Sequence, residues 1–424
     1  MRILHVVHQF LPEYTGGTEQ YVADLSRRLC DGGHDVAIFT GGNNPGRHDW
    51  QGIPVTVVPG GLRGPRGAVS LFASSFGNRG IEAGFTSLLQ DFRPDVVHFH
   101  HLIGLSTRLP RIARESSAAA CFTLHDYWFI CPKSQLINHA GAPCSGPVLG
   151  LNCGQCAAER LGKPYLQAGA PAVAPVFVLR QRRVRRAFSE VDLLLAPSQF
   201  VADFAIRAGL PRDRIERVDF GIPTLALPPR SAALKVMDAP LRVLFLGAVS
   251  WSKGVHVLAE ACRLLDPTKV DVRIMGDLNA YPEYSAPLMD TARELPLRFE
   301  GQASRAEVAA ALASSDVLVI PSLWYENAPL VISEAFAAGA PVVASNIGAL
   351  AEKVRDGVDG LLFPPGDAPA LAAVIARLAI DRPLLQQLRD GIRQGVTREQ
   401  HVNQMMQIYE RLCAPRRPAG QVAP

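Results

Sequence analysis

The chain has 424 residues, 48% of them hydrophobic, and a formal net charge of only +4. This length predicts two or three domains, and the apolar fraction is that of a soluble protein with a sizeable core. So small a net charge gives no strong positive field, which argues against nucleic acid as a partner. The sequence contains no apolar run of about eighteen residues and no recognisable signal peptide. We therefore expect a cytoplasmic protein whose eight cysteines are mostly reduced, unless a metal holds some of them.

The first half of the chain alternates short β-branched runs with longer amphipathic ones. Residues 18–33 are predicted to form a helix, which Thr18 caps and two glycines end. Strands that alternate with helices predict a parallel sheet covered on both faces. The strands predicted in this half are Arg2–Val7, Asp35–Phe39, Ile53–Val58, Asp95–His100 and Cys121–Leu124.

A second alternating series follows a break in the pattern. Residues 225–240 are rich in proline and small residues, so we interpret them as an interdomain linker. The linker separates an N-terminal Rossmann-like domain (1–224) from a C-terminal one (241–396). A last helix and a disordered proline-rich tail (397–424) complete the chain. Ligands of such sheets bind at the carboxyl ends of the strands, here in the cleft between the domains. The strands predicted in the second half are Arg242–Gly247, Asp271–Gly276, Leu297–Gly301, Asp316–Pro321 and Pro341–Ser345.

Two predicted helix starts have the composition of phosphate sites. Gly16 and Gly17 follow the first strand and open the first helix. Lys253 and the glycine after it stand in the equivalent place in the second half. Glycines let backbone amides approach an anion, and an ammonium opposes the helix dipole unless an anion lies there. A plain tight turn and an exposed surface lysine are the alternative interpretations.

Two glutamates with seven residues between them lie in "WYENAPLVISEAFAAGAPVVAS". Glu326 falls in the loop after a strand, where it would face the cleft. Glu334 falls about a turn into a helix that starts near Pro329, among apolar neighbours. A carboxylate in that setting should accept hydrogen bonds, and a sugar or ribose diol matches its two oxygens. A glutamate bonded to a nearby amide or arginine is the alternative.

These motifs have counterparts along most of the chain. The N-terminal half contains "GGTEQYVADLSRRL", "PDVVHFHHL", "TLHDYWFICP" and "APSQF", and the glutamate segment continues into "EAFAAGAPVVASNIGALAEKVRDGVDGLLFPPGD". In this order they resemble the retaining family 4 glycosyltransferases of GT-B fold. The resemblance implies an α/β protein of two Rossmann-like domains facing each other across a cleft. It also implies a C-terminal helix that returns to the N-terminal domain.

The resemblance assigns roles to individual residues. Lys253 would bind the donor diphosphate, Glu334 the ribose hydroxyls, and Glu326 the donor sugar. His125 would lie beside the sugar ring and help to stabilise the transition state, so the implied catalytic residues are His125, Glu326 and Lys253. The implied donor-binding residues are Gly16, Gly17, Ser252, Lys253, Ala328, Pro329, Leu330, Val331 and Glu334, and His100 and Asp126 would lie on the acceptor side.

One position departs from the family pattern. Ala248 stands where the family usually carries an arginine, after the glycine that ends the first strand of the second domain. A fixed cation there would stabilise the charge that develops on the leaving diphosphate. Either another arginine reaches in, or Lys253 and the helix dipole suffice, or the enzyme is slow. We expect activity to be retained because the other site residues are present.

The function predicted is the transfer of a sugar, with retention of configuration, from a nucleotide-diphosphate sugar to a glycan or lipid-linked acceptor. This activity would serve the synthesis of a cell-surface polysaccharide or glycoconjugate. No Asp-x-Asp pair stands at a cleft-facing strand end, so we expect no catalytic metal. The alternatives are a nucleotide-sugar epimerase or phosphorylase, and a non-catalytic protein that binds nucleotide sugars or glycans.

Four cysteines fall in a loop rich in glycine and proline, residues 131–156. The last two form a Cys-x-x-Cys pair, which favours a structural zinc site, whereas disulfides and free thiols are the alternatives. The loop follows His125, so we expect it to shape the acceptor side of the cleft. The predicted zinc ligands are Cys131, Cys144, Cys153 and Cys156.

The basic run from Arg180 to Arg186 is compatible with a solvated helix face or with attraction to anionic lipid. The second interpretation suits an enzyme at the inner face of a membrane. No aromatic stacking platform accompanies the run, which argues against nucleic acid. His98, His100 and His101 invite a metal interpretation, but adjacent strand residues face opposite sides, so His100 and His101 should not share an ion.

Overall fold

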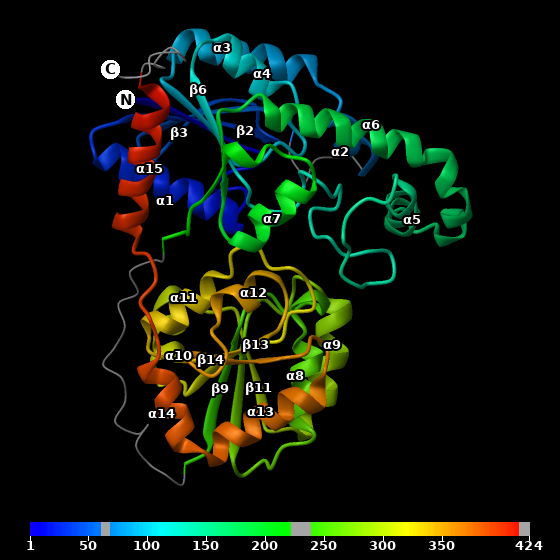
Figure 1. The fold of residues 1–424 in the computed structure, drawn as a ribbon, viewed down its shortest axis with the longest axis vertical. Coiled ribbons are helices and arrows are strands. Elements are labelled where there is room, and N and C mark those ends of the chain that lie inside the picture. Colours follow the sequence, from blue (N-terminus) through cyan, green and yellow to red (C-terminus); the bar gives the residue numbers. More distant parts are fainter. Residues whose placement is uncertain (61–67, 222–238, 415–424) are drawn as a thin grey trace, which may run out of the picture.

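Two parallel sheets, each covered by helices on both faces, form two domains that lie one above the other (Figure 1). The computed structural model describes residues 1–60, 68–221 and 239–414. Most of the predicted linker and the proline-rich tail therefore lie outside the described residues. Among the described residues, no helix is both long and apolar enough to cross a bilayer.

The N-terminal sheet has eight strands in the order β3-β4-β2-β1-β5-β6-β7-β8. All neighbours are parallel except β3, which pairs antiparallel with β4 at one edge. Side chains alternate between the two faces, so Leu4 and Val6 enter one core cluster while Ile3 and Val7 enter another. The strands are β1 (Arg2–Val7), β2 (Asp35–Gly42), β3 (Gly46–Trp50), β4 (Ile53–Pro59), β5 (Val96–Phe99), β6 (Ala119–Thr123), β7 (Leu193–Ala196) and β8 (Ile215–Arg217).

The helices of this domain cover both faces of its sheet. Phe85, Leu109 and Phe188 come from three helices that pack on one face. Val22 of the first helix and Met405 of the last pack on the other. The helices are α1 (Gly17–Asp31), α2 (Ala68–Ser74), α3 (Arg79–Phe92), α4 (Leu109–Glu115), α5 (Leu151–Arg160), η1 (Pro164–Gly169), α6 (Ala170–Ser189), α7 (Gln199–Arg207) and η2 (Arg212–Arg214).

The C-terminal sheet has six parallel strands in the order β11-β10-β9-β12-β13-β14. Its strands are β9 (Leu241–Leu246), β10 (Val270–Met275), β11 (Leu297–Gly301), β12 (Val317–Ile320), β13 (Val342–Ser345) and β14 (Gly360–Phe363). The accompanying helices are η4 (Trp251–Lys253), α8 (Val255–Cys262), α9 (Pro282–Thr291), η5 (Ala292–Glu294), α10 (Arg305–Ser314), α11 (Leu330–Ala337), α12 (Gly348–Lys353), α13 (Ala368–Ile380) and α14 (Arg382–Asp390).

The last helix, α15 (Arg398–Cys413), leaves the C-terminal domain and runs along the N-terminal one (Figure 1). Its buried residues Met405, Ile408 and Tyr409 join the core cluster that also contains Val22 of α1. The expectation that the C-terminal helix returns to the N-terminal domain is therefore confirmed.

The predicted strands match the observed ones to within a few residues at each end, and four further strands, β3, β7, β8 and β14, were not predicted. The predicted cap of the first helix is wrong. Gly16 is the N-cap, and no side chain supplies a cap hydrogen bond. The helix needs no threonine cap because Glu19, in its first turn, brings a carboxylate to its positive end.

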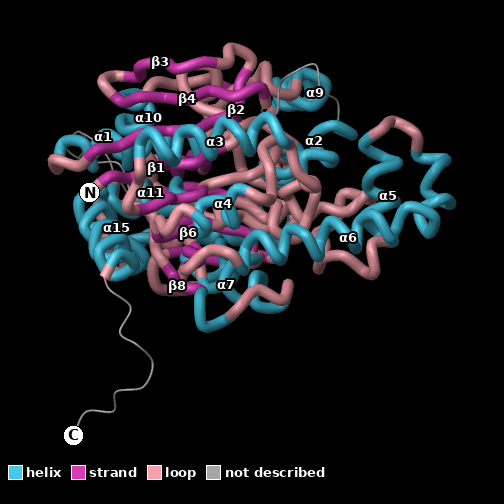
Figure 2. Tube along the Cα trace, turned by 90° about the horizontal axis from the view of Figure 1, so that it is seen from above, coloured by secondary structure: helices cyan, strands magenta, loops and turns pink. Residues whose placement is uncertain are grey.

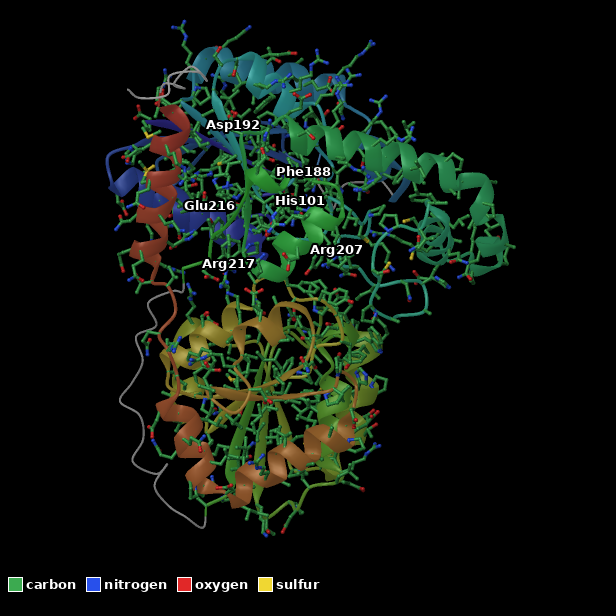
Figure 3. All side chains as sticks on the ribbon, in the orientation of Figure 1. His101, Phe188, Asp192, Arg207, Glu216 and Arg217 are labelled. Carbon is green, nitrogen blue, oxygen red and sulfur yellow. The ribbon has the colours of Figure 1, made fainter. Side chains whose placement is uncertain are left out.

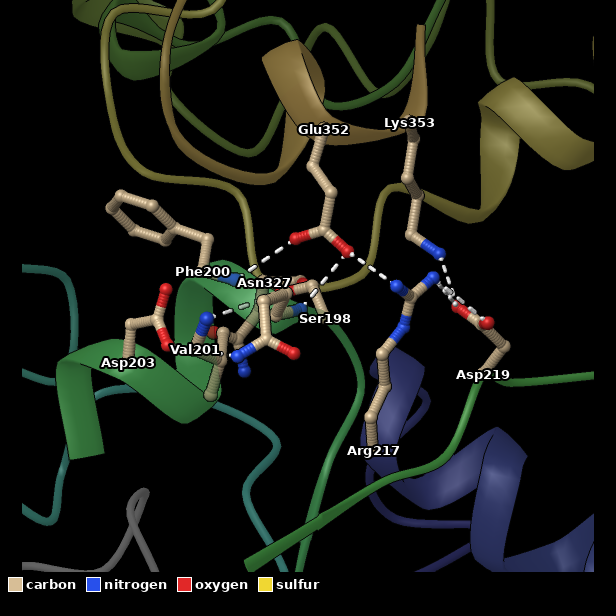
Figure 4. A network of polar contacts seen from close by, with 10 residues as sticks. Ser198, Phe200, Val201, Asp203, Arg217, Asp219, Asn327, Glu352 and Lys353 are labelled. Atoms are coloured by element: carbon tan, nitrogen blue, oxygen red, sulfur yellow. Dashed lines mark hydrogen bonds and ion pairs between the residues drawn. The ribbon is translucent and has the colours of Figure 1, made fainter. Parts of the chain in front are cut away.

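Glu352 of α12 joins the two domains (Figure 4). One of its carboxylate oxygens accepts from the backbone N–H of Gln199 at 2.9 Å, and the other from that of Phe200 at 2.8 Å. These are free N–H groups of the first turn of α7, whose dipole favours an anion. Arg217 adds an ion pair to Glu352 at 3.2 Å, and it lies where the two domains meet (Figure 3).

Candidate functional site

A cavity of about 270 Å³ opens where strands β9 and β10 of the C-terminal sheet end. Gly276 follows β10 and packs so closely that a side-chain Cβ would lie 1.8 Å from the carbonyl oxygen of Gly247. The backbones of these two strand ends thus form the floor of the cavity. The residues around it are Leu246, Gly247, Met275, Gly276, Gln302, Ala303, Arg305, Val308, Val331 and Glu334.

Glu334 projects from α11 into this cavity. Its carboxylate is half-buried, and it receives no hydrogen bond from the part of the chain that the structure describes. Burial raises the pKa of Glu334, against the opposing charges of Arg305 and Arg398. Protein hydroxyls and amides therefore do not satisfy this carboxylate, although partners are expected for such a group.

Glu326 and Lys253 form an ion pair, with the ammonium 2.6 Å from Oε1 of the glutamate. Ser322 Oγ donates to the same oxygen at 2.8 Å, and the indole N–H of Trp324 donates to it at 3.1 Å. All three donors converge on one oxygen, and only 6% of Glu326 is exposed. The other carboxylate oxygen of Glu326 has no partner among the described side chains and can accept from a ligand hydroxyl.

The start of α11 presents backbone N–H groups beside this pair. Those of Ala328, Leu330 and Val331 have no acceptor within the described residues, as is usual for a first helical turn. Pro329, the N-cap, has no N–H, so it shapes the turn and cannot contribute the amide expected of it. Three amides at a helix N-terminus favour an anion.

The sequence analysis did not identify a cation that could replace the arginine absent at Ala248. Arg305 begins α10 and lines the same cavity as Gly247 and Glu334. It makes no ion pair among the described residues, so it is a cation available to a ligand there. Ser252, predicted to bind the donor, hydrogen-bonds with Ser250 at 3.2 Å. The signal for Arg305 was its place just after a strand end, at the edge where ligands bind.

The loop after β1 leaves the carboxyl edge of the N-terminal sheet and ends at Gly16 and Gly17, where α1 begins. A Cβ on Gly16 would lie 2.4 Å from a carboxylate oxygen of Glu19, whereas nothing lies within 4 Å of a Cβ on Gly17. Gly16 is thus fixed by Glu19, and space is open beside Gly17. Glu19 is 2% exposed and lies 3.7 Å from the ring of His8, a buried pair that the sequence analysis missed.

His125 follows β6 and belongs to a chain of hydrogen-bonded imidazoles. Its Nε2 lies 3.0 Å from Nδ1 of His100, whose Nε2 lies 2.9 Å from Nδ1 of His5. Burial lowers the pKa of His5 and of His125 to about 3, and burial followed by the nearby histidines lowers the pKa of His100 far below its usual value. All three rings are therefore neutral near pH 7.

Neutral imidazoles each carry one N–H, so the chain can run in only two directions. If His5 donates to His100 and His100 to His125, then Nε2 of His125 is the acceptor and its Nδ1–H is free to donate. The reverse direction leaves an N–H at Nε2 of His5, which is buried and has no partner in the part of the chain that the structure describes. An unpaired N–H is costly in such a place, so we assign the first direction.

His98 extends the same polar layer under α15. Its ring nitrogens lie 2.7 Å from the hydroxyls of Tyr409 and Thr123. His5, His98 and His100 form the one group of three potential metal ligands found among the described residues. Five of their six ring nitrogens are already used in hydrogen bonds and all three side chains are fully buried, so these contacts favour a structural network over a metal site.

The two predicted acceptor-side residues behave differently. Asp126 is half-buried and its carboxylate lies 2.7 Å from Nε2 of His101, a residue that lies inside the N-terminal domain (Figure 3). His100, predicted to face the acceptor, is instead fully buried behind His125. It lies one residue beyond β5 on the face that α15 covers, and adjacent His101 points the other way, as the strand alternation requires.

Asn327 brings the two halves of the site together. Its side-chain amide donates to the carbonyl oxygen of Leu124 at 2.7 Å. Leu124 directly precedes His125, and Asn327 directly follows Glu326. The bond thus ties the loop of the glutamate to the loop of the histidine across the domain boundary.

Two family models match the chain. "Glycosyl transferase 4-like domain" matches residues 16–221, and "Glycosyl transferases group 1" matches residues 240–381. The MMP alpha-(1->4)-mannosyltransferase of Mycolicibacterium hassiacum is 31% identical over 95% of this chain and 96% of its own. The chain belongs to the family 4 glycosyltransferases.

Other relatives of this glycosyltransferase are more partial or more distant. The amylovoran biosynthesis glycosyltransferase AmsK of Erwinia amylovora is 31% identical, but the match spans 54% of this chain and 58% of AmsK. HepE from Anabaena, solved in complex with UDP, superposes with a TM-score of 0.69 at 17% identity, covering 97% of this chain and 100% of HepE. Such a structural match shows the GT-B fold alone.

The cysteine-rich loop of this glycosyltransferase surrounds a second cavity, which is almost wholly apolar. Cys131, Cys144, Cys153 and Cys156 all line it. Burial, followed by the neighbouring cysteines, raises the pKa of the Cys153 thiol to about 12. The sulfurs therefore lie near one another, yet no three of them fall within 4.8 Å of one another. Zinc binding by this loop stays a prediction.

The basic run proves to be of mixed character. Arg180 is only 1% exposed, donates to the carbonyl oxygen of Trp128 at 2.9 Å, and lies over the ring of Trp128. Burial lowers its pKa to about 10, so it remains charged. Arg180 therefore cannot meet solvent or lipid, whereas Arg182 and Arg186 on the same helix are exposed, and attraction of the run to a membrane stays a prediction.

Proposed function

We propose that this protein transfers a sugar, with retention of configuration, from a nucleotide-diphosphate sugar to a glycan or lipid-linked acceptor. The observation that carries the proposal is Glu334. It is a half-buried carboxylate that faces an open cavity at the carboxyl edge of a parallel sheet and receives no hydrogen bond from the described residues. A ribose diol offers two hydroxyls to its two oxygens. The UDP found in HepE gives the family a precedent for such a ligand.

The diphosphate would lie between Lys253 and the start of α11. There it can accept from the ammonium, from the hydroxyl of Ser252 and from the free amides of Ala328, Leu330 and Val331. Lys253 is neutralised by Glu326 before the donor binds. A diphosphate placed there would share the lysine, which frees Glu326 to accept from hydroxyls of the donor sugar.

The sugar would extend from Glu326 towards His125 across the domain boundary. The bond between Asn327 and Leu124 holds these two loops together. With the tautomer assigned above, His125 presents an Nδ1–H, which can donate to an oxygen of the sugar or of the leaving group. Fixed donors of this kind stabilise charge that develops in the transition state.

Retention follows if the acceptor attacks from the side that the diphosphate leaves. The bond from the anomeric carbon to the phosphate oxygen breaks as the bond to the acceptor oxygen forms. The departing phosphate oxygen takes the proton of the acceptor hydroxyl, so no protein base is required. The protein supplies positioning, charge stabilisation and exclusion of water. This scheme needs no metal ion.

Incubation with a labelled donor tests the proposal. UDP-glucose is the first donor to try, because HepE was also solved with it. Transfer or slow hydrolysis releases nucleoside diphosphate, and the anomeric configuration of the product reports retention. An epimerase would change the sugar without release of nucleotide. Binding without turnover on any acceptor would favour a non-catalytic protein, and recovery of turnover by Ala248→Arg would then identify the missing cation.

We also propose that the four cysteines of residues 131–156 hold a structural zinc ion. The proposal is supported by their placement around one cavity, and it requires side-chain rotations that bring the sulfurs closer. About one zinc per chain, lost in Cys153→Ser, is the expected result of a metal analysis. Zinc-free protein with unchanged thermal stability would contradict it.

The site of action that we propose is the cytoplasmic face of a membrane. A lipid-linked acceptor would require the cleft to approach a bilayer, and the exposed arginines of α6 supply attraction to anionic lipid.

A further inference from the structure

A helical arm projects from the side of the N-terminal domain, as α5 and α6 show in Figure 2. We call residues 148–179 the apolar arm. Nine of the sixteen exposed large hydrophobic side chains of the described chain lie in these 32 residues. Surface hydrophobic residues are normal when scattered, but a group of this size marks an interaction site. The nine are Val148, Leu149, Leu151, Leu161, Tyr165, Leu166, Val173, Val176 and Leu179.

The apolar arm is rigidly built, so its exposed side chains are not merely those of a loose loop. A Cβ on Gly150 would lie 2.4 Å from the carbonyl oxygen of Ala174, and one on Gly154 would lie 2.9 Å from the Cβ of Ala170. These glycines let α5 and α6 pack closely. Arg180 then fixes the base of the arm through its bond to the carbonyl oxygen of Trp128, three residues after His125.

Positive charge accompanies the apolar side chains. Residues 140–189 contain seven arginines and lysines and one acidic residue, Glu159, which pairs with Lys133 at 3.3 Å. Arg160, Lys163 and Arg182 are exposed and form no ion pair within the described residues. The arm and the adjoining turns of α6 therefore present exposed basic side chains that no acidic residue pairs within the described residues.

The exposed face of α6 changes from apolar to basic along the helix. Val176, Leu179, Arg183 and Arg186 follow one another at spacings of three and four residues, so they lie in one stripe. Ten residues of helix span about 15 Å. An interfacial helix has its apolar side chains about 5–10 Å deep and its basic residues among the headgroups. When the arm enters a bilayer by its tip, the apolar residues of the stripe lie deeper than its basic residues, as in such a helix.

We propose that the apolar arm docks on an anionic lipid bilayer, with its tip among the acyl chains and its basic residues at the phosphates. A second copy of the chain fits less well, because a symmetric contact would bring two basic surfaces together. A bilayer also accepts side chains that point in several directions, whereas a protein partner would need a matching groove. This inference rests on the proposed function only in placing a lipid-linked acceptor near His125.

The test is sedimentation of the full-length protein with vesicles. The wild type is expected to bind vesicles of equal parts phosphatidylcholine and phosphatidylglycerol, more weakly at high salt, and to bind pure phosphatidylcholine far less. Leu149 and Leu166 are 78% and 47% exposed, so L149D/L166D leaves the core intact. We expect it to lower the affinity about tenfold or more, and R160E/K163E to abolish the preference for phosphatidylglycerol.

The matched control is L264D/I380D in the C-terminal domain, where the two side chains are 61% and 70% exposed. It should bind vesicles like the wild type. Absence of wild-type binding, or an equal loss in control and arm variants, would overturn the proposal. So would a dimer in light scattering that L149D/L166D disperses, since the arm would then be an interface between copies. Donor hydrolysis without vesicles should be equal in all variants, so vesicle binding without hydrolysis would refute the proposed function alone.

Discussion

Nine of the eleven histidines lie within residues 1–139, whereas between residue 241 and the end of α14 there is one, His256. The N-terminal sheet carries a buried polar layer between its strands and α15, made of histidines, Tyr409 and Thr123. The buried polar residues of the described C-terminal domain include no histidine. One domain thus holds its candidate site residue, His125, through a network of neutral rings. The C-terminal domain instead presents individual charged side chains at the edge of an apolar core.

Acid should produce the largest difference between the two domains, because it destabilises the N-terminal domain more than the C-terminal one. Burial lowers the pKa of His5 and His125 to about 3 and that of His401 to about 4. In the unfolded chain these groups titrate near 6.5, so below this pH the unfolded state binds more protons than the folded state. The contribution of these histidines to the free energy of unfolding is therefore constant above pH 6.5 and falls as the pH drops towards 4. Each such histidine contributes about 1.4 kcal/mol per pH unit.

Hydrogen exchange can measure this effect separately for the two sheets. With correction for the intrinsic exchange rate, peptides of β1 and β5 should lose protection between pH 6.5 and 4.5, and peptides of β9 and β12 should keep it. Equal loss of protection in both sheets would show that the histidine layer does not control acid stability. Carboxylates with lowered pKa values, such as Asp316, change stability only at lower pH, so they do not account for a loss of protection between pH 6.5 and 4.5.

Glu326→Gln should produce the next largest effect. The substitution keeps the shape of the side chain and removes the charge that pairs with Lys253. We expect turnover to fall about 100-fold, because the sugar loses a charged acceptor in the transition state. Donor affinity should change little, since the freed lysine can bind the diphosphate more strongly. Glu300→Gln, at an ion pair with Arg273, is the control. Unchanged turnover would remove Glu326 from the site.

The parallel strands could be predicted from sequence because strands buried on both faces are continuous β-branched runs. Strands β3 and β8 escaped prediction because they are polar edge strands. Strands β7 ("LLLA") and β14 ("GLLF") escaped because they contain no β-branched residue. The burial of Arg180 did have a signal. Val184 and Ala187, four and seven residues further on, share its side of the helix and are buried.

Several contacts at the candidate site were beyond sequence reasoning. The partner of Glu326 is 73 residues away in the chain, and the amide that joins the domains reaches over 203 residues. A histidine in a strand can face either solvent or a helix from elsewhere, so His100 could be placed only once α15 was seen to cover it. The glutamates, by contrast, were predicted to lie at strand and helix ends because the α/β pattern fixes where those ends meet.

Arg305→Ala tests whether the donor cavity has a cation to replace the one absent at Ala248. Arg305 lines the cavity with Glu334 and has no ion pair of its own among the described residues. Its loss should weaken binding of UDP about tenfold by calorimetry, as expected for one charge-assisted contact. The pKa of Glu334 should rise further, since Arg305 holds it down. Arg298→Ala, at an exposed pair with Asp271, is the control, and equal affinities would exclude Arg305.

Glu352→Gln should give the smallest effect, because it weakens the contact between the domains without touching either core. Two N–H groups of α7 lose a charged acceptor, and Arg217 loses one of its two acidic partners. Caps and exposed ion pairs of this kind contribute about 1 kcal/mol or less. If the contact stabilises the arrangement in which the domains face the donor together, donor affinity should fall by about threefold, in proportion to the population of that arrangement. The thermal stability of each domain should stay the same. A loss of stability without a change in affinity would mean that Glu352 serves only as a helix cap for α7, and that the two domains meet without its help.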